Sequence, residues 1–288
     1  MAAPAQTIDT RAYRDKYRIA KFDYLLRNAV VAEKICEVDR SESKRIQNPY
    51  GSQATATVQA IAGTYTIKNY QLNDDTLTVA DEIVVGEHIF DFESMLTNFD
   101  LFSSRTDEQL YAVTKDVDKF VLNVLCEDGT GSYTTPAGGF TTAANIITIM
   151  GNLLSKVSGY ADTYKGLYLV IEDTDLPGFI AAQAGNGFTM SDKALSNGFI
   201  GRYMNTDIYV VRSGTFTNDT MGSRSDFTNS GHRLFGVKNT TTYATPRGVK
   251  FLEKEVSGKT GKEVATVALV GAKVWASKSS LTIDITLA

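Results

Sequence analysis

The sequence predicts an α+β fold, and three observations support that class. Apolar residues recur at helical spacing from Arg105 to Glu127 and again from Thr141 to Val157. The chain after Gly248 reads instead as successive strands, which are Val249–Val256, Val264–Trp275 and Leu281–Leu287. Long helices beside a block of strands are typical of α+β proteins.

The N-terminal part contains little that would fold alone. Residues 1–12 are small and polar, which indicates a flexible tail. From Tyr17 the apolar residues fall near helical spacing, until the polar segment 39–53 ends the pattern. Ala54–Ile67 alternates small, threonine and apolar residues around Gly63, which predicts two extended segments. A two-stranded ribbon with few large apolar side chains is only marginally stable in water, so we expect this segment to pack against another molecule.

A β-rich run from Thr76 to Phe92 leads into the first long helix. In Thr106–Gln109, the first and last residues have the spacing of a capping box, and the two acidic residues between them suit the positive end of a helix. Gly129 is expected to end this helix. The apolar face of this helix is expected to comprise Leu110, Val113, Val117, Phe120, Val121 and Val124.

The second helix is expected to begin at Thr141 or Thr142, which are good N-cap residues. The apolar run Gly166–Ile171 then predicts a buried strand, and Pro177 predicts the first turn of a further helix. The side chains predicted on the buried face of the second helix are Ile146, Ile147, Met150, Leu153, Leu154 and Val157.

The segment Ala194–Arg212 predicts the end of a short helix, a glycine turn and a second buried strand. Ser191–Asp192 can cap that helix, and Asn197–Gly198 can end it. Ile208–Val211 is β-branched and aromatic, as strands prefer. The polar loop Ser213–Arg233 is long for a compact domain, which indicates exposure, contact with a partner or mobility.

This series of strand, helix, loop, helix, "NGFIG" turn and strand resembles the central domain of tailed-bacteriophage major capsid proteins, the Hong Kong 97-type fold. Tyr13–Glu37 resembles the family's N-terminal arm, Arg45–Asp74 its extended loop, and Arg105–Glu127 its spine helix. Asp75–Phe92 is similar to the strand before the spine, and Gly248–Trp275 to the strand pair that returns beside it. The resemblance implies five parts, which are an N-terminal arm (1–45), an extended β-hairpin loop (46–75), a peripheral domain with the spine helix (76–140), a central axial domain (141–245) and the return strands of both domains (246–288).

The function implied by this resemblance is that of a major capsid protein. Such a chain self-assembles as pentamers and hexamers into an icosahedral shell that encloses double-stranded DNA without reading its sequence. We then expect a virion protein assembled in the host cytoplasm, with a separate scaffolding protein, a portal protein and a decoration protein as partners and no membrane. Some family members cross-link subunits through a lysine, and Lys68 lies in the right segment. No partner for it can be matched by motif, so no cross-link is assigned. An encapsulin-type nanocompartment shell, which holds cargo enzyme, is the alternative within the fold.

Composition excludes several other classes. Hydrophobic residues make up 43% and charged residues 22% of the chain, which is an ordinary globular balance. The formal net charge of −4 argues against a strongly basic nucleic-acid-binding surface. The sequence shows no signal-peptide core and no apolar run of membrane-spanning length. Cys36 and Cys126 lie in apolar helical patterns, so packed thiols in a reducing compartment are expected.

One enzymatic hypothesis competes with a shell. Ser41–Lys44, Ser191–Lys193 and Lys259–Gly261 imitate, in order, the motifs of penicillin-binding serine acylases. That chemistry needs Ser41 at the start of a sheltered helix, with Lys44 one turn away as the base. The motif lies instead in a polar connector, where a solvated lysine stays protonated.

Other candidate motifs are weaker still. Gly258–Thr260 is similar to the end of a phosphate-binding loop, but Glu253 replaces the required glycine. His88 and His232 lack metal-site spacing, and we expect His88 to be half-buried on its strand and His232 to be solvated. We therefore predict no catalytic, cofactor-binding or metal-binding residue, no cofactor, and a protein that is not an enzyme.

Overall fold

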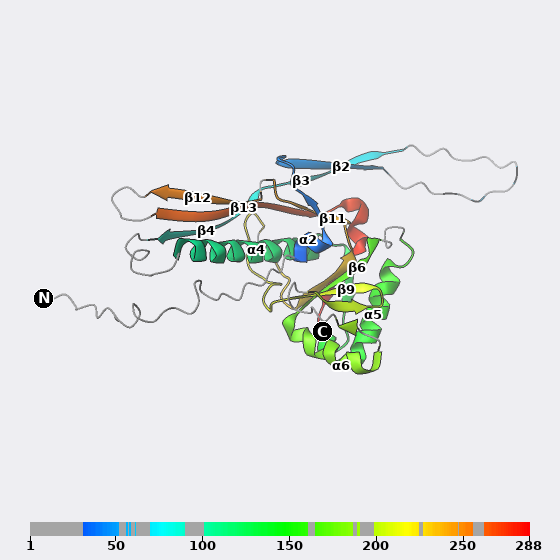
Figure 1. The fold of residues 1–288 in the computed structure, drawn as a ribbon. Coiled ribbons are helices and arrows are strands. Elements are labelled where there is room, and N and C mark those ends of the chain that lie inside the picture. The colour runs from blue at the N-terminus through cyan, green and yellow to red at the C-terminus, as the bar shows by residue number, and fades with distance from the viewer. Residues whose placement is uncertain are drawn as a thin grey trace, which may run out of the picture.

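One long helix lies between two sheets. The structure, a computed structural model, describes residues 31–51, 56, 58, 61, 70–89, 101–160, 165–186, 189–190, 199–224, 227–246, 248–255 and 262–288. Figure 1 shows α4 (Leu101–Asp128) running along one face of the upper sheet, with the lower sheet beneath its C-terminal end. The other described α-helices are α2 (Val31–Ile35), α5 (Ala143–Val157) and α6 (Leu176–Asn186).

The upper sheet, here called the long sheet, contains five strands. Its central strand β13 (Lys262–Val274) pairs antiparallel with β12 (Val249–Glu255) on one side and β4 (Asp81–Ile89) on the other. Further along, β13 pairs with β11 (Thr241–Ala244), to which β1 (Glu37–Asp39) adds a short parallel strand. The predicted strand pair beside the long helix is thus confirmed.

The lower sheet contains seven strands in the order β5–β14–β10–β6–β9–β8–β7. Its β5/β14 and β6/β9 pairs are parallel, and the other neighbours are antiparallel. The buried strands predicted at Gly166–Ile171 and Ile208–Val211 lie side by side at its centre. Its members are β5 (Gly131–Thr134), β6 (Leu167–Glu172), β7 (Thr189–Met190), β8 (Phe199–Tyr203), β9 (Thr206–Val211), β10 (His232–Val237) and β14 (Thr282–Thr286).

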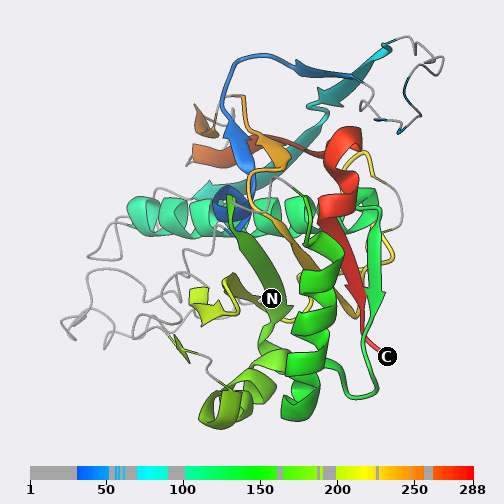
Figure 2. The same ribbon diagram turned by 90° about the vertical axis from the view of Figure 1, so that its right-hand side faces the viewer.

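The lower sheet is buried on both faces, so successive residues of one strand serve different hydrophobic cores. Tyr168 and Val170 of β6 pack in the core that contains α4 and the long sheet. Leu167, Leu169 and Ile171 pack in the core under α5 and α6. Figure 2 shows α5 lying across this second face of the sheet.

The long helix starts earlier than predicted. Because α4 begins at Leu101, Thr106 and Gln109 are interior residues, and the expected capping box is wrong. Gln109 is 2% exposed, and its Oε1 accepts a hydrogen bond from the Thr266 hydroxyl at 2.9 Å, so it joins the helix to β13. The predicted apolar face is correct from Val113 to Val124, but Leu110 is 38% exposed.

The second predicted helix is confirmed, but its buried face is rotated slightly from the predicted one. Thr142 is the N-cap residue of α5. Ile149 is fully buried, whereas Ile147, predicted on the buried face, is 41% exposed. The stripe that faces the sheet therefore follows 146, 149, 150, 153 and 157, the pattern that a helix with one covered face produces.

The β-rich run Thr76–Phe92 does not form one strand. It breaks after Thr78, where β3 (Leu72–Thr78) ends, and β4 begins at Asp81. Val79 between them is buried, because it belongs to a small apolar cluster at the end of β3.

The polar loop Ser213–Arg233 is not simply exposed in its described part. Phe216 and Phe227 are 3% and 1% exposed, and the Phe227 ring meets the edge of Phe120 on α4. The Asn123 amide donates to Thr215 O at 2.8 Å and its Oδ1 accepts from the Thr217 amide at 3.1 Å. The loop is therefore fixed to the long helix.

Several predictions fall on residues outside the described part of the chain. These are the tail at residues 1–12, the arm before Val31, most of Ala54–Ile67, Lys68, and the short helix with its caps at Ser191–Gly198. The arm enters the described structure at α2, and its first amides donate to Asp118 of α4.

Candidate functional site

A two-stranded ribbon formed by β2 (Arg45–Gly51) and β3 packs against the rest of the described chain at its base. The strands pair antiparallel along their whole length, and Figure 1 shows them on the side of the long sheet opposite α4. Near its far end, Leu72 and Tyr70 are 66% and 71% exposed. Exposed apolar side chains on a narrow ribbon are typical of contact with another molecule.

The base of the ribbon is anchored by a small apolar cluster. The indole N–H of Trp275 in this cluster donates to Thr242 Oγ1 at 2.8 Å. Because the cluster holds one end of the ribbon, it sets the direction in which the other end projects. Its members are Leu77, Val79, Ala244 and Trp275, with Ile46 packed against them.

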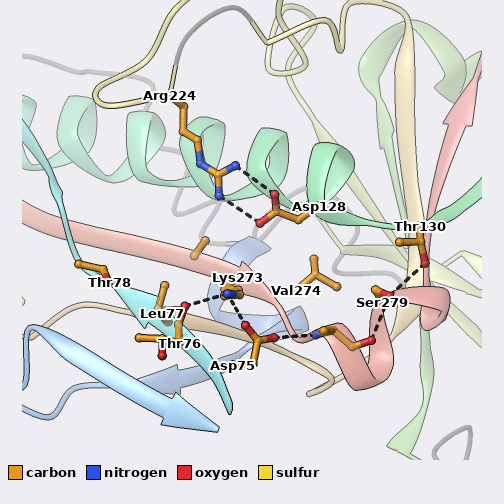
Figure 3. A pocket seen from close by; sticks show the side chains of 12 residues that line it. Asp75, Thr76, Leu77, Thr78, Asp128, Thr130, Arg224, Lys273, Val274 and Ser279 are labelled. Carbon is orange, nitrogen blue, oxygen red and sulfur yellow. Dashed lines mark hydrogen bonds and ion pairs between the residues drawn. The ribbon is translucent and has the colours of Figure 1, made fainter. Parts of the chain in front are cut away.

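Beside this base lies a polar hollow of about 540 Å³, shown in Figure 3. Asp75 of β3 accepts from the Ala276 amide at 2.8 Å and forms an ion pair with Lys273. Lys273 also donates to Thr76 O at 2.7 Å. Burial alone would raise the pKa of Asp75, but the Ala276 N–H and Lys273 outweigh it and hold that pKa below its usual value.

The opposite wall of the hollow is a bidentate ion pair. Arg224 donates to both carboxylate oxygens of Asp128, at 3.0 and 3.1 Å, and this hydrogen bonding raises the pKa of Arg224. The neighbouring Ser223 hydroxyl donates to Asp81 at 3.0 Å. These contacts tie the polar loop to the end of α4 and to the start of β4.

The side chains around the hollow are suited to holding separate segments of the chain together. Its two cations are each paired with a carboxylate, and the Thr130 hydroxyl donates to Ser279 at 3.0 Å. Among the described residues, no group of three or more His, Cys, Asp or Glu side chains is placed to hold a metal ion.

The outer face of the long sheet is a second uncovered surface. The register places Val84 of β4 and Lys250 of β12 opposite Val267, and Leu252 opposite Ala265, so these side chains share the face away from α4. Val84 and Leu252 are 53% and 55% exposed. Since α4 covers the other face, this outer face is available for contact.

Only the first of the three acylase motifs lies in the described part of the chain. Ser41 and Lys44 lie in an exposed connector between β1 and β2, where the Ser41 amide donates to Asp39. No helix begins at Ser41, so the sheltered nucleophile that the chemistry requires is missing there. The partner motifs Ser191–Lys193 and Lys259–Gly261 lie outside the described residues.

Of the two predictions about histidines, one is confirmed and one is wrong. His88 is half-buried on β4, as expected. The expectation that His232 is solvated is wrong, because it begins β10 and its Nδ1 lies 2.8 Å from Asp284 Oδ1 with the ring 18% exposed. Both cysteines are free and buried, as predicted. Burial raises the pKa of Cys36 to about 12, so its thiol stays protonated.

The charged residues that line the hollow were not predicted from the sequence. Asp75, Arg224 and Lys273 come from distant segments, and only the fold brings them around one hollow. Lys273 did carry a signal, since it is the one charge in the apolar stretch Val264–Trp275. A lysine inside a buried strand needs a partner.

Solved structures that resemble this chain share one fold. No protein-family model and no curated protein matches the sequence. The capsid structure of cyanophage P-SCSP1u matches with a TM-score of 0.66 at 13% identity, over 93% of this chain and 91% of that chain. The capsid of a native GTA particle matches with a TM-score of 0.66 at 13% identity, over 100% of both chains.

A structure from Mycobacterium phage Ogopogo gives a TM-score of 0.67 at 10% identity, over 98% of this chain and 99% of that chain. The chain therefore has the Hong Kong 97-type capsid fold, as its sequence predicted. None of the helices in the described part of the chain is long and apolar enough to span a membrane.

Proposed function

We propose that the protein is the major capsid protein of a tailed bacteriophage, a structural protein that self-assembles into an icosahedral shell around double-stranded DNA. The observation that carries this proposal is the match of its fold, over nearly the whole chain, to subunits of phage and GTA capsids. In this fold the function is the assembly itself, so fold and function are more closely linked than in an enzyme scaffold.

The uncovered surfaces support the proposal. The ribbon exposes Leu72 and Tyr70, and the outer face of the long sheet exposes Val84 and Leu252. No described segment of the chain covers either surface. Neighbouring copies in a shell would bury both, and burial of apolar area is the main stabilisation of such contacts.

The proposal extends to the parts of the chain and to its partners. Residues 76–140 form a peripheral domain and 141–245 a central axial domain, and the arm (1–45) and extended loop (46–75) tie neighbours together. Pentamers and hexamers build the shell in the host cytoplasm, with a separate scaffolding protein, a portal protein and a decoration protein. The subunit has no catalytic role.

Electron microscopy of the purified full chain tests the proposal, with closed shells as the expected result. The matched variant replaces residues 52–69 with a short glycine–serine turn and keeps both ribbon strands. Since the anchor of the ribbon lies at its base, this variant should keep the circular dichroism spectrum and thermal unfolding of the wild type but fail to close shells. A wild-type chain that stays monomeric up to its solubility limit would contradict the proposal.

A further inference from the structure

Positive side chains from four segments gather at one end of the lower sheet. The Lys238 amide donates to Gly166 O at 2.9 Å, and Lys165 Nζ donates to Asn239 O at 3.5 Å, so the segments before β6 and after β10 lie side by side. The four residues, here called the basic cluster, are Lys34 of α2, Lys165 before β6, Arg202 of β8 and Lys238 after β10.

The buried ring of Tyr209 on β9 brings two of these ammonium groups together. Lys238 Nζ lies 5.3 Å from the centroid of this ring, and Lys34 Nζ lies 5.9 Å from it. Burial lowers the pKa of Lys34; Asp118 opposes that shift, and the charge of Lys238 adds to it. Two like charges beside one ring repel each other, so an anion bound near them would reduce that repulsion.

The carboxylate of Asp207 on β9 is shared by two members of the cluster. It accepts a hydrogen bond from Arg202 Nε at 2.7 Å and forms an ion pair with Lys238. Burial alone would raise the pKa of Asp207, but the hydrogen bonds from Arg202 and Lys238 outweigh it and lower that pKa. Glu33 of α2 pairs with Arg40 at 3.2 Å. The described residues thus place four positive charges around this one shared carboxylate.

The cluster lies where solvent reaches it. The Arg202 side chain is 62% exposed, and the three lysines are partly exposed. Cations that come from separate segments are spread over an area of surface, which suits a ligand with several negative charges along its length. A nucleic-acid backbone is such a ligand, because each phosphate carries one charge and the phosphates are regularly spaced.

We propose that the basic cluster binds phosphate groups of a nucleic-acid backbone. Contacts of this kind carry no sequence information. They hold the polymer weakly, since Asp207 offsets part of the local charge and the whole chain has a formal net charge of −4. The source of the phosphates rests on the proposed function, in which the shell encloses double-stranded DNA.

Fluorescence anisotropy of a short labelled duplex tests the site. The duplex is titrated with the purified full-length chain, at protein concentrations at which the chain stays unassembled. The affinity should fall as salt rises, because bound phosphates release counterions. Lys34→Gln with Lys165→Gln removes two cations, so the slope of log affinity against log salt should become shallower by about 2. Lys250→Gln with Lys254→Gln is the matched control on β12, and it should keep the wild-type slope.

A single variant makes the opposite change in charge. Asp207→Asn removes the shared carboxylate, so the affinity at low salt should rise about fivefold, the factor that one unit charge contributes at contact distance in water. A variant that only damaged the fold would not bind the duplex more tightly. Circular dichroism and thermal unfolding show whether each variant keeps the wild-type fold.

Several outcomes would overturn the site. They are a wild-type chain that does not bind the duplex, an unchanged slope in the cluster variant, and an equal change in the β12 control. Tighter binding of polyglutamate than of a duplex with the same charge would assign the cluster to an acidic peptide and overturn the phosphate assignment. Because the assay needs no shell, a chain that passes it and builds no shells would contradict the proposed function alone.

Discussion

Arg233 shows how a single buried charge organises the lower sheet. It is 2% exposed, and its guanidinium forms ion pairs with Asp175 and, at 3.1 Å, with Glu172. Glu172 also accepts from the Gly214 amide at 3.0 Å. One strand residue thus fixes both the start of α6 and the beginning of the polar loop.

Replacement of this cation should be costly. Arg233→Met leaves two buried carboxylates without their partner, and we expect a loss of about 3–5 kcal/mol in the free energy of unfolding. Arg202→Met is the matched control, because Arg202 also pairs with an aspartate but is 62% exposed, and it should cost less than about 1 kcal/mol. Urea denaturation of both variants measures the difference, and equal losses would contradict the assigned role of Arg233.

Two glycines in helices differ in the space that is available for a side chain. A Cβ at Gly178 of α6 would lie 2.0 Å from Phe140 O, whereas one at Gly151 of α5 would meet nothing within 4 Å. Gly151→Ala should stabilise the protein by about 0.5–1 kcal/mol, because alanine loses less backbone entropy in a helix. Gly178→Ala should destabilise it, since backbone must move. Thermal unfolding measures both signs; stabilisation by Gly178→Ala would show that α6 has room to shift.

At the scale of elements, the sequence identified most helices and strands but not their rotation or their exact ends. The periodic residues of α4 and α5 are evident in the sequence because each helix has one covered face. Leu110 and Ile147 were placed on those faces because an apolar residue at the margin of a stripe looks the same whether it is covered or not. The predicted capping box is wrong because α4 begins at Leu101, so Thr106 and Gln109 lie inside the helix, where Gln109 contacts Thr266.

The corrected face of α4 can be tested directly. Val117→Asp places a carboxylate in the core, where Val117 is 4% exposed, and it should cost several kcal/mol and leave little soluble protein. Leu110→Asp makes the same change at a site that is 38% exposed, and it should be tolerated. Soluble yield and thermal unfolding distinguish them. If the two variants behave alike, the helix is rotated from the orientation described.

At the scale of the whole molecule, the order and lengths of elements predicted the fold, while sheet pairing could not be foreseen. Nothing local in Gly131–Thr134 indicates a parallel partner in β14, and nothing in Arg224 indicates Asp128. Such pairs depend on long-range packing. The two extended segments were predicted at Ala54–Ile67, most of which lies outside the described residues, whereas the ribbon is formed by Arg45–Gly51 and Leu72–Thr78. The polar pattern of residues 39–53 predicted a connector and did not indicate that Arg45–Gly51 is a strand.

A double variant tests the shell against the acylase at this scale. Ser41→Ala with Lys44→Ala changes two exposed connector residues, so particle yield should remain near that of the wild type, as expected for surface substitutions that move stability by within about 0.5 kcal/mol. Intact-mass measurement after exposure to a β-lactam probe is the companion assay. A covalent adduct on the wild type that Ser41→Ala abolishes would favour the enzyme.

The position of β13 and β14 in the chain has a consequence for biosynthesis. β13 is the central strand of the long sheet, and β14 lies between β5 and β10 in the lower sheet. Both are translated after every other described strand, so neither sheet can close until the ribosome has made Lys262–Thr286. A nascent chain therefore cannot complete either sheet before β13 and β14 have been made. Chains terminated before Lys262 would lack the strand that pairs with both β4 and β12, so the core against α4 would stay incomplete.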